Sequence, residues 1–159
     1  MAANQVLTNA LGRVAELYKR VDTNDPSASV LVVVLIASTS IESDAILKDK
    51  TTLTDYVSGA TNESTNTGYA RKVLSDSDLV AWDPDEANDW VLLDIPDQTW
   101  TAVANDGTGA IAALLICYDP SSSGATASVI EVLTQHAFAV TPDGSDITAQ
   151  VPNGFYKAT

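Results

Sequence analysis

The stretch VLVVVLIA at residues 30–37 limits the possible folds more than any other part of the chain. It is apolar at every position and rich in β-branched residues, which favour extended backbone. A strand that is apolar on both faces needs cover on both sides, so we expect residues 30–37 to form a central strand. The run is far too short to span a membrane as a helix.

Further short apolar segments follow at close intervals, separated by residues that are typical of turns. One of these turns, NDGTG at 105–109, predicts a hairpin between its flanking segments, because Gly107 and Gly109 tolerate positive φ. Residues 41–57 are ambiguous and permit two short helices. The overall pattern predicts a mainly β protein, with an antiparallel β-sandwich or barrel-like domain over residues 26–159.

The N-terminal segment has a different periodicity. Apolar residues recur at helical spacing at Leu7, Leu11, Val14, Tyr18 and Val21. This spacing predicts an amphipathic helix over roughly residues 4–21, within an N-terminal unit of residues 1–25. Asn4 is the candidate N-cap, and Pro26 ends the helix because it disfavours helical backbone at the preceding residue. The helix packs on its own domain or is lent to a neighbouring subunit.

The charge of the chain is strongly acidic and unevenly distributed. The net charge is −13, and no lysine or arginine occurs between Val73 and Tyr156, where thirteen acidic residues lie. Such a charge disfavours direct binding to nucleic acid or to an anionic membrane, so we expect neither partner. It fits either a solvated, self-repelling surface or a surface that binds a basic partner.

Basic residues are instead concentrated near the N-terminus, where Arg13, Lys19 and Arg20 face only one acid, Glu16. On the predicted helix these three side chains fall on or beside the face opposite the apolar stripe. We therefore predict that Arg13, Lys19 and Arg20 form a docking surface for an acidic neighbour. The alternative is that the acidic body of the protein faces a basic partner.

The only cysteine, Cys117, and the only histidine, His136, lie close in sequence with Asp119 between them, which raises the question of a catalytic triad. In the predicted strands, Cys117 shares a face with apolar residues such as Leu115, and His136 shares a face with Val132. A reactive thiolate needs a polar or electropositive setting, which this segment lacks. We therefore predict two buried structural residues, no catalytic residue and no enzyme activity.

Metal and cofactor sites are also not indicated. The loop DPDEAND at 83–89 gathers acidic residues, but it has Ala87 and Asn88 where an EF-hand needs an oxygen ligand and a glycine. An acidic hairpin loop is the favoured interpretation, and a weak surface cation site is the alternative. One cysteine and one histidine cannot form a zinc site within one chain, and no dinucleotide or P-loop glycine pattern is present. We expect no cofactor.

Several ordered segments resemble a family of small virion proteins of tailed bacteriophages, variously called head decoration, cement or minor tail proteins. The resemblance rests on SVLVVVLIAS at 29–38, TGYARKVL at 67–74, DIPDQTWTAV at 94–103, IAALLICYDP at 111–120 and LTQHAFAVTPDGSDITAQVPNGFYKA at 133–158. Its most specific parts are GYARK, IPDQTW and the C-terminal segment. The resemblance implies a mainly β, structural, non-enzymatic subunit with no catalytic pattern.

The resemblance implies a structural virion protein, most simply a capsid decoration or cement protein that stabilises the head, and the composition agrees with such a role. Its expected partner is the major capsid protein or another virion protein, and its expected location is the virion, assembled in the host cytoplasm. The start of the chain lacks a basic region followed by an apolar core, so we expect no signal peptide.

The abundance of apolar surface on the strands and helix favours a homo-oligomer, and the resemblance implies a trimer. Two alternatives remain open: a tail or fibre adaptor, and an extracellular glycan-binding module that would present Trp82, Trp90 or Trp100 on its surface. A hydrolase that uses Cys117 and His136 is the least favoured alternative.

Overall fold

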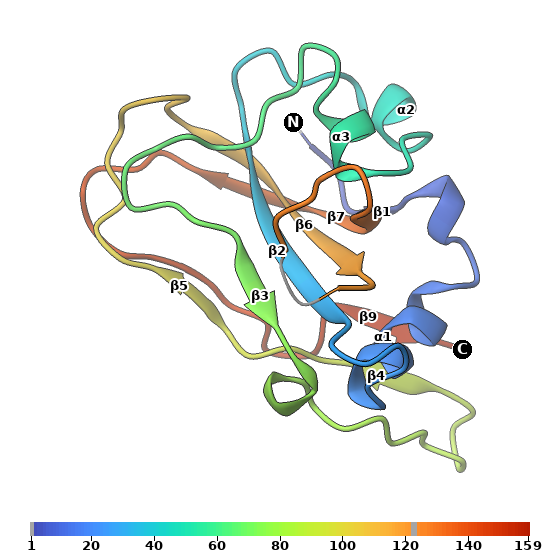
Figure 1. Ribbon diagram of the computed structural model, residues 1–159. Coiled ribbons are helices and arrows are strands. Elements are labelled where there is room, and N and C mark those ends of the chain that lie inside the picture. The colour runs from blue at the N-terminus through green and yellow to red at the C-terminus, as the bar shows by residue number, and fades with distance from the viewer. Residues whose placement is uncertain (1, 122–123) are drawn as a thin grey trace.

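A five-stranded antiparallel sheet with the order β1-β7-β6-β2-β3 is the centre of the computed structural model, which describes residues 2–121 and 124–159 (Figure 1). Its strands are β1 (Gln5–Val6), β2 (Val30–Ala37), β3 (Lys72–Leu74), β6 (Ile111–Asp119) and β7 (Glu131–Val140). Two antiparallel ribbons accompany this sheet: β4 (Val91–Leu93) with β9 (Tyr156–Ala158), and β5 (Gln98–Trp100) with β8 (Ile147–Ala149). The protein is therefore mainly β and antiparallel, as predicted, and the described strands form no closed barrel.

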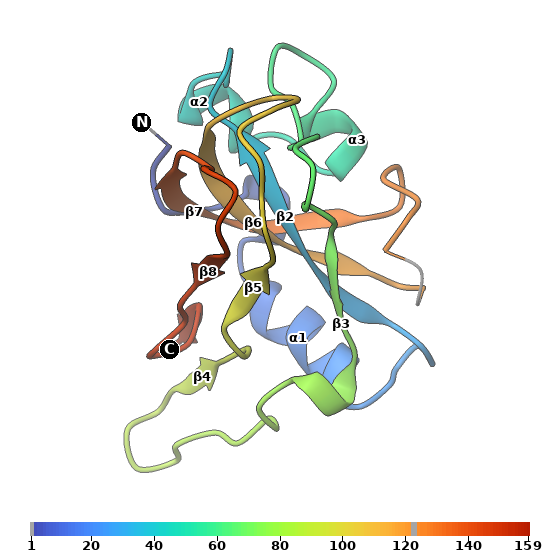
Figure 2. The same ribbon diagram turned by 90° about the vertical axis from the view of Figure 1, so that its left-hand side faces the viewer.

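Helices are short. They are α1 (Val14–Asp22), α2 (Asp44–Leu47), α3 (Leu53–Tyr56) and the 3-10 turns η1 (Thr8–Ala10) and η2 (Asp76–Asp78). In Figures 1 and 2, α2 and α3 lie together at one end of the sheet, and α1 lies at the other end near β4. The two helices α2 and α3 confirm the pair that the sequence permitted over residues 41–57. None of the described helices has the length and apolar character that a membrane crossing requires.

The expectation of a central strand at 30–37 is confirmed. Every residue of β2 is buried, and β2 pairs with β6 along almost its whole length and with β3 on its other edge. Every residue of β6 is buried as well. Both faces of the sheet are therefore covered within a single chain.

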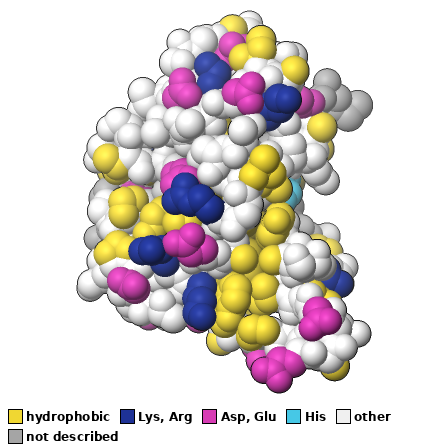
Figure 3. All heavy atoms as spheres, turned by 90° about the vertical axis from the view of Figure 1, so that its right-hand side faces the viewer, with side chains coloured by type: hydrophobic (Ala, Val, Ile, Leu, Met, Phe, Trp, Pro, Cys, Tyr) yellow, Lys and Arg dark blue, Asp and Glu magenta, His cyan; other side chains and the backbone are white. Residues whose placement is uncertain are grey.

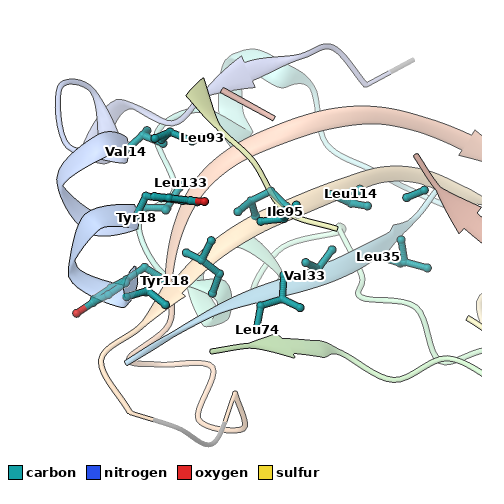
Figure 4. Packing of buried hydrophobic residues seen from close by; sticks show 14 of the residues in the cluster. Val14, Tyr18, Val33, Leu35, Leu74, Leu93, Ile95, Leu114, Tyr118 and Leu133 are labelled. Carbon is teal, nitrogen blue, oxygen red and sulfur yellow. The ribbon is translucent and has the colours of Figure 1, made fainter. Parts of the chain in front are cut away.

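Each face of the sheet has its own hydrophobic cluster, because alternate residues of a strand point to opposite sides. Leu31, Val33 and Leu35 lie in one cluster, with Val14 and Tyr18 of α1 and with residues of the ribbons; Figure 4 shows the α1 side chains pointing toward the sheet. We call this side the ribbon face. Val32, Val34 and Ile36 lie in the other cluster, with Leu47 of α2 and with Leu53 and Tyr56 of α3. We call this side the helix face.

The predicted helix over 4–21 is wrong in its first half, since α1 begins only at Val14. Gln5 and Val6 pair with β7 instead, and the Asn4 carboxamide accepts a hydrogen bond from the Ala137 amide rather than capping a helix. Gly12 has a φ of +76°, which a right-handed helix does not allow. Tertiary pairing with β7 therefore overrides the helical periodicity of the sequence.

This change redistributes the predicted apolar stripe. Leu7 is buried on the helix face, whereas Leu11 is 64% exposed. Val14, Tyr18 and Val21 remain on the buried side of α1, as predicted. The segment before α1 thus crosses from one face of the sheet to the other.

The hairpin predicted around NDGTG is also wrong. Gly107 and Gly109 do have positive φ, but β5 pairs with β8, and both edges of β6 are occupied by β2 and β7. Residues 64–67 hold the loop instead: the Asn66 side chain exchanges hydrogen bonds with the backbone of Gly109. The turn chemistry was recognised correctly, but local sequence did not identify the strands that it connects.

Candidate functional site

Cys117 and His136 lie on opposite faces of the sheet. Cys117 is fully buried on the helix face, and burial raises the pKa of its thiol well above the ordinary value. His136 lies on the ribbon face, because a bulge at Leu133 shifts the register: Ile116 pairs with Thr134, but Cys117 pairs with Val132. One additional residue reverses the alternation of side chains, so the prediction that His136 shares a face with Val132 is wrong.

Asp119 has a structural contact of its own. One of its carboxylate oxygens accepts hydrogen bonds from the amide and hydroxyl of Ser121, at 2.9 and 2.8 Å, and the other accepts one from the Gly124 amide at 3.0 Å. The three residues considered as a triad are therefore not assembled, and Asp119 instead binds Ser121 and Gly124 beyond the end of β6.

Asp85 organises the acidic loop at 83–89. Its carboxylate accepts hydrogen bonds from the amides of Ala87 and Asn88 and from the Asn88 carboxamide, at 3.1, 3.1 and 2.8 Å. These bonds, chiefly that from the Asn88 side chain, lower the pKa of Asp85. Within residues 2–121 and 124–159, no three acidic, histidine or cysteine side chains gather in a way that could hold a metal ion. Within the loop, Asp85 therefore has a turn-forming role.

The predicted docking residues all have contacts within the chain. Arg13 pairs with Glu131 at 2.7 Å, and Arg20 pairs at 3.0 Å with Glu16, one turn earlier in α1. The Lys19 ammonium lies 5.3 Å from the centre of the Trp82 ring, within cation–π range. The first two contacts neutralise charge, but Arg13 and Arg20 keep almost half of their side-chain surface exposed. Figure 3 shows basic and acidic side chains mixed beside an apolar strip on this side of the molecule.

The tryptophans give little surface for stacking against a sugar. Trp100 is buried, and its indole N–H donates a hydrogen bond to the Ala70 carbonyl at 2.8 Å. Trp82 and Trp90 are half-buried, and a lysine lies over each ring, with the Lys157 ammonium 4.2 Å from the centre of Trp90. A glycan that stacks on these rings would therefore have to displace a lysine from one face or use the other.

A polar network around Arg71, within the GYARK segment, was not expected from the sequence. The Arg71 guanidinium forms two hydrogen bonds with the Glu63 carboxylate, at 2.8 and 2.7 Å, and a third with the Gly124 carbonyl at 2.9 Å. The Tyr69 hydroxyl donates to the same carboxylate at 2.8 Å. Burial is the main cause of the raised pKa of Tyr69. This network joins the loop before β3 to the loop after β6.

The ribbon face has a cleft that the sequence did not indicate. It lies between β7, which contributes His136 and Phe138, and the β5–β8 ribbon with Phe155, and its volume is about 280 Å³. We call it the His136 cleft. No sequence signal could have located it, because the bulge at Leu133 alone places His136 on this side.

His136 is held in place within the cleft. Its Nε2 lies 2.9 Å from the Thr134 hydroxyl, and its ring stands nearly perpendicular to Phe155 with the ring centres 6.3 Å apart. Burial lowers the pKa of the imidazole below its ordinary value and so favours its neutral form.

Comparisons with protein-family models, with curated proteins and with solved structures find no match to this chain. The resemblance to small virion proteins therefore remains an expectation that rests on the sequence segments that carry it.

Proposed function

We propose that this chain is a structural protein of a tailed-phage virion, acting as a head decoration or cement subunit that binds the major capsid protein as a homotrimer. The proposal starts from the sequence resemblance and from the acidic, mainly β character of the chain. In this proposal the five-stranded sheet and the two ribbons form the layers of a β-sandwich-like domain.

The observation that carries the proposal is the way in which polar side chains tie remote segments to the sheet. Asp119 fixes the turn after β6, and Arg71 with Glu63 fastens the same turn to the loop before β3. The side chain of Gln135 binds the Ala3 carbonyl, Asp44 and the Tyr56 hydroxyl. Segments tied in this way open less readily, and resistance to opening is what a shell-reinforcing subunit needs.

The charge distribution favours docking through the acidic body. Arg13 and Arg20 already pair within the chain, so the surface of α1 has little net charge to offer an acidic neighbour. Residues 21–159 contain twenty acidic and five basic residues, a net charge of −15. A basic surface on the partner would be attracted to this body, more strongly at low salt than at high salt.

The oligomeric state is a separate part of the proposal. The sequence favours a homo-oligomer because apolar strands need cover, but β2 and β6 are covered within one chain. The trimer therefore rests on the resemblance alone. Sedimentation equilibrium with and without capsid particles tests it, and a monomer on the particle would contradict it.

Binding to separated heads and tails tests the proposed role directly. Purified protein, mixed with particles that lack it, should co-sediment with heads and raise the temperature at which they release DNA. Co-sedimentation with tails alone would contradict the cement role and support the tail-adaptor alternative. Binding to neither particle would contradict a virion role altogether.

Charge variants distinguish the two docking surfaces. Replacing Asp83, Glu86 and Asp89 with their amides spares Asp85, which holds the loop, and should weaken head binding at low salt. The matched control replaces Arg13, Lys19 and Arg20 with glutamine and should have the smaller effect. A larger effect of the basic variant would support the N-terminal docking surface instead. Deleting residues 1–21 would not serve as a test, because it removes Val14 and Tyr18 from the core.

A further inference from the structure

We propose that the His136 cleft binds one small, uncharged aromatic molecule that carries a hydroxyl or N–H donor. This inference concerns a different part of the molecule from the docking surfaces and does not depend on the virion role. It follows from the shape of the cleft, from two polar atoms on its wall and from the absence of charged side chains among its described lining residues.

The walls of the cleft are fixed by backbone contacts. The Phe155 amide donates a hydrogen bond to the Leu93 carbonyl at 2.9 Å, which places the Phe155 ring against His136. Gly154, with a φ of +71°, makes the close turn before it; a Cβ there would lie 2.7 Å from the Leu93 carbonyl oxygen. A cleft whose walls are fixed in this way is available to a ligand without prior rearrangement.

Two polar atoms of the cleft wall have no protein partner. Gln98 is only 5% exposed and its side-chain nitrogen donates to the Pro96 carbonyl at 2.6 Å, whereas its Oε1 accepts no hydrogen bond from any described residue. His136 uses Nε2 toward Thr134, and its Nδ1 has no hydrogen-bond partner among residues 2–121 and 124–159. Neither atom is among the buried polar atoms that lack a partner, so both are open to solvent, and a donor on the ligand can replace the water that would otherwise bond to Gln98.

The remaining wall sets the size and chemistry of the ligand. The rings of Phe138, Phe155 and His136 favour an aromatic molecule, which packs against them edge to face or offset. A cavity of about 150 Å³ is enough for benzene, so about 280 Å³ accommodates one ring or two fused rings. A charged ligand would lose its hydration without an ionic partner on the wall, which excludes it on energetic grounds.

Titration with indole, 1-methylindole and indole-3-carboxylate tests the proposal on the unaltered protein. His136 is the only histidine, so its imidazole signals in the NMR spectrum report on the cleft without ambiguity. Indole should shift these signals in a saturable manner. Methylation of its nitrogen removes the donor for Gln98 and should weaken binding about tenfold. The charged probe should not bind.

Two variants locate the binding site. Ala149 lies on the cleft wall in β8, so Ala149→Leu should fill the cleft and abolish the indole response, whereas Thr148→Leu on the opposite side of the same strand should leave it intact. Backbone NMR spectra confirm that each variant is folded. An absent or non-saturable His136 response, equal affinity for indole and 1-methylindole, or undiminished binding by a folded Ala149→Leu protein would each overturn the proposal.

Discussion

The two faces of the central sheet are covered in different ways, although the strands between them are equally apolar on both sides. On the helix face, α2, α3 and the flanking loops pack on the sheet, and polar networks around Gln135 and Arg71 hold them at the margins, where Ala2, Ile41 and Asp44 line a hollow. On the ribbon face, α1 and two short ribbons cover the sheet and leave the His136 cleft open. A strand that is apolar on both faces therefore requires other segments to pack on both sides of it. How completely those segments exclude solvent depends on their own sequence.

Adjacent leucines in β6 provide the largest test of this difference. Leu115 is fully buried on the helix face, whereas Leu114 is 7% exposed and lines the cleft. We expect Leu115→Ala to lower the free energy of unfolding by about 4 kcal/mol and Leu114→Ala by about 2 kcal/mol, because the cleft already leaves Leu114 with fewer neighbours. Urea unfolding measures both. Equal losses would show that the ribbon face is packed as tightly as the helix face.

The buried carboxamide of Gln135 provides the next test. Its Nε2 donates to the Ala3 carbonyl and to Asp44, at 2.9 and 2.8 Å, and its Oε1 accepts from the Tyr56 hydroxyl. We expect Gln135→Met to cost about 3 kcal/mol in the free energy of unfolding, since the buried Tyr56 hydroxyl and the partly buried Asp44 and Ala3 carbonyl lose their partner at once.

Tyr18 supplies the matched control on the ribbon face. Its hydroxyl lies 2.6 Å from the carbonyls of both Val80 and Asp94, and burial raises its pKa to about 12. Tyr18→Phe should cost about 1 kcal/mol, because a hydroxyl donates only one hydrogen bond. If Tyr18→Phe lowers the free energy of unfolding more than Gln135→Met does, the polar contacts of the helix face do not stabilise the protein more than those of the ribbon face.

Two ion pairs of the protein differ in how far they are exposed to solvent. Glu63 and Arg71 are each about one-fifth exposed and share two hydrogen bonds, whereas Glu16 and Arg20 pair on the exposed side of α1. We expect Glu63→Gln to lower the free energy of unfolding by about 2 kcal/mol, through weaker bonds to Arg71 and Tyr69. Glu16→Gln should cost less than about 0.5 kcal/mol, because an exposed pair is weak. Similar effects in chemical unfolding would argue that the Arg71 network contributes no more than a surface pair.

The sequence predicted the parts of this structure that depend on local composition. The central strand at 30–37, the mainly β class and the positive φ of Gly107 and Gly109 all follow from residue type. The helix start was missed because Gln5 and Val6 gain more from pairing with β7 than from helical periodicity. These pairings depend on partners that are far away in sequence.

The candidate site was beyond the reach of the sequence for a similar reason. His136 and Gln98 come together only through the bulge at Leu133 and the pairing of β5 with β8. Nothing in the residues near Leu133 marks the bulge, and an unbroken alternation places His136 on the wrong face. The docking role of Arg13, Lys19 and Arg20 stays a prediction. The ion pair of Arg13 could not be predicted, because its partner Glu131 lies in a strand remote in sequence.

The smallest expected effect comes from His136 and depends on pH. Burial lowers the pKa of His136 in the folded protein, whereas the unfolded chain keeps the ordinary value of 6.5. The unfolded state therefore binds more protons below pH 6.5, and stability falls as the pH is lowered from 7 through this value. His136→Phe keeps a ring against Phe155 and removes the titrating group, so the stability of this variant should change less between pH 7 and pH 5.

The carboxylates of Asp85, Asp106 and Asp143, whose pKa values are lowered by hydrogen bonds, contribute only at more acidic pH. Urea unfolding at a series of pH values, with both proteins in the same buffers, measures the difference. Identical pH profiles would mean that the imidazole is hydrated as freely in the cleft as in the unfolded chain, and that the ribbon face is more open at this point than its lining residues indicate.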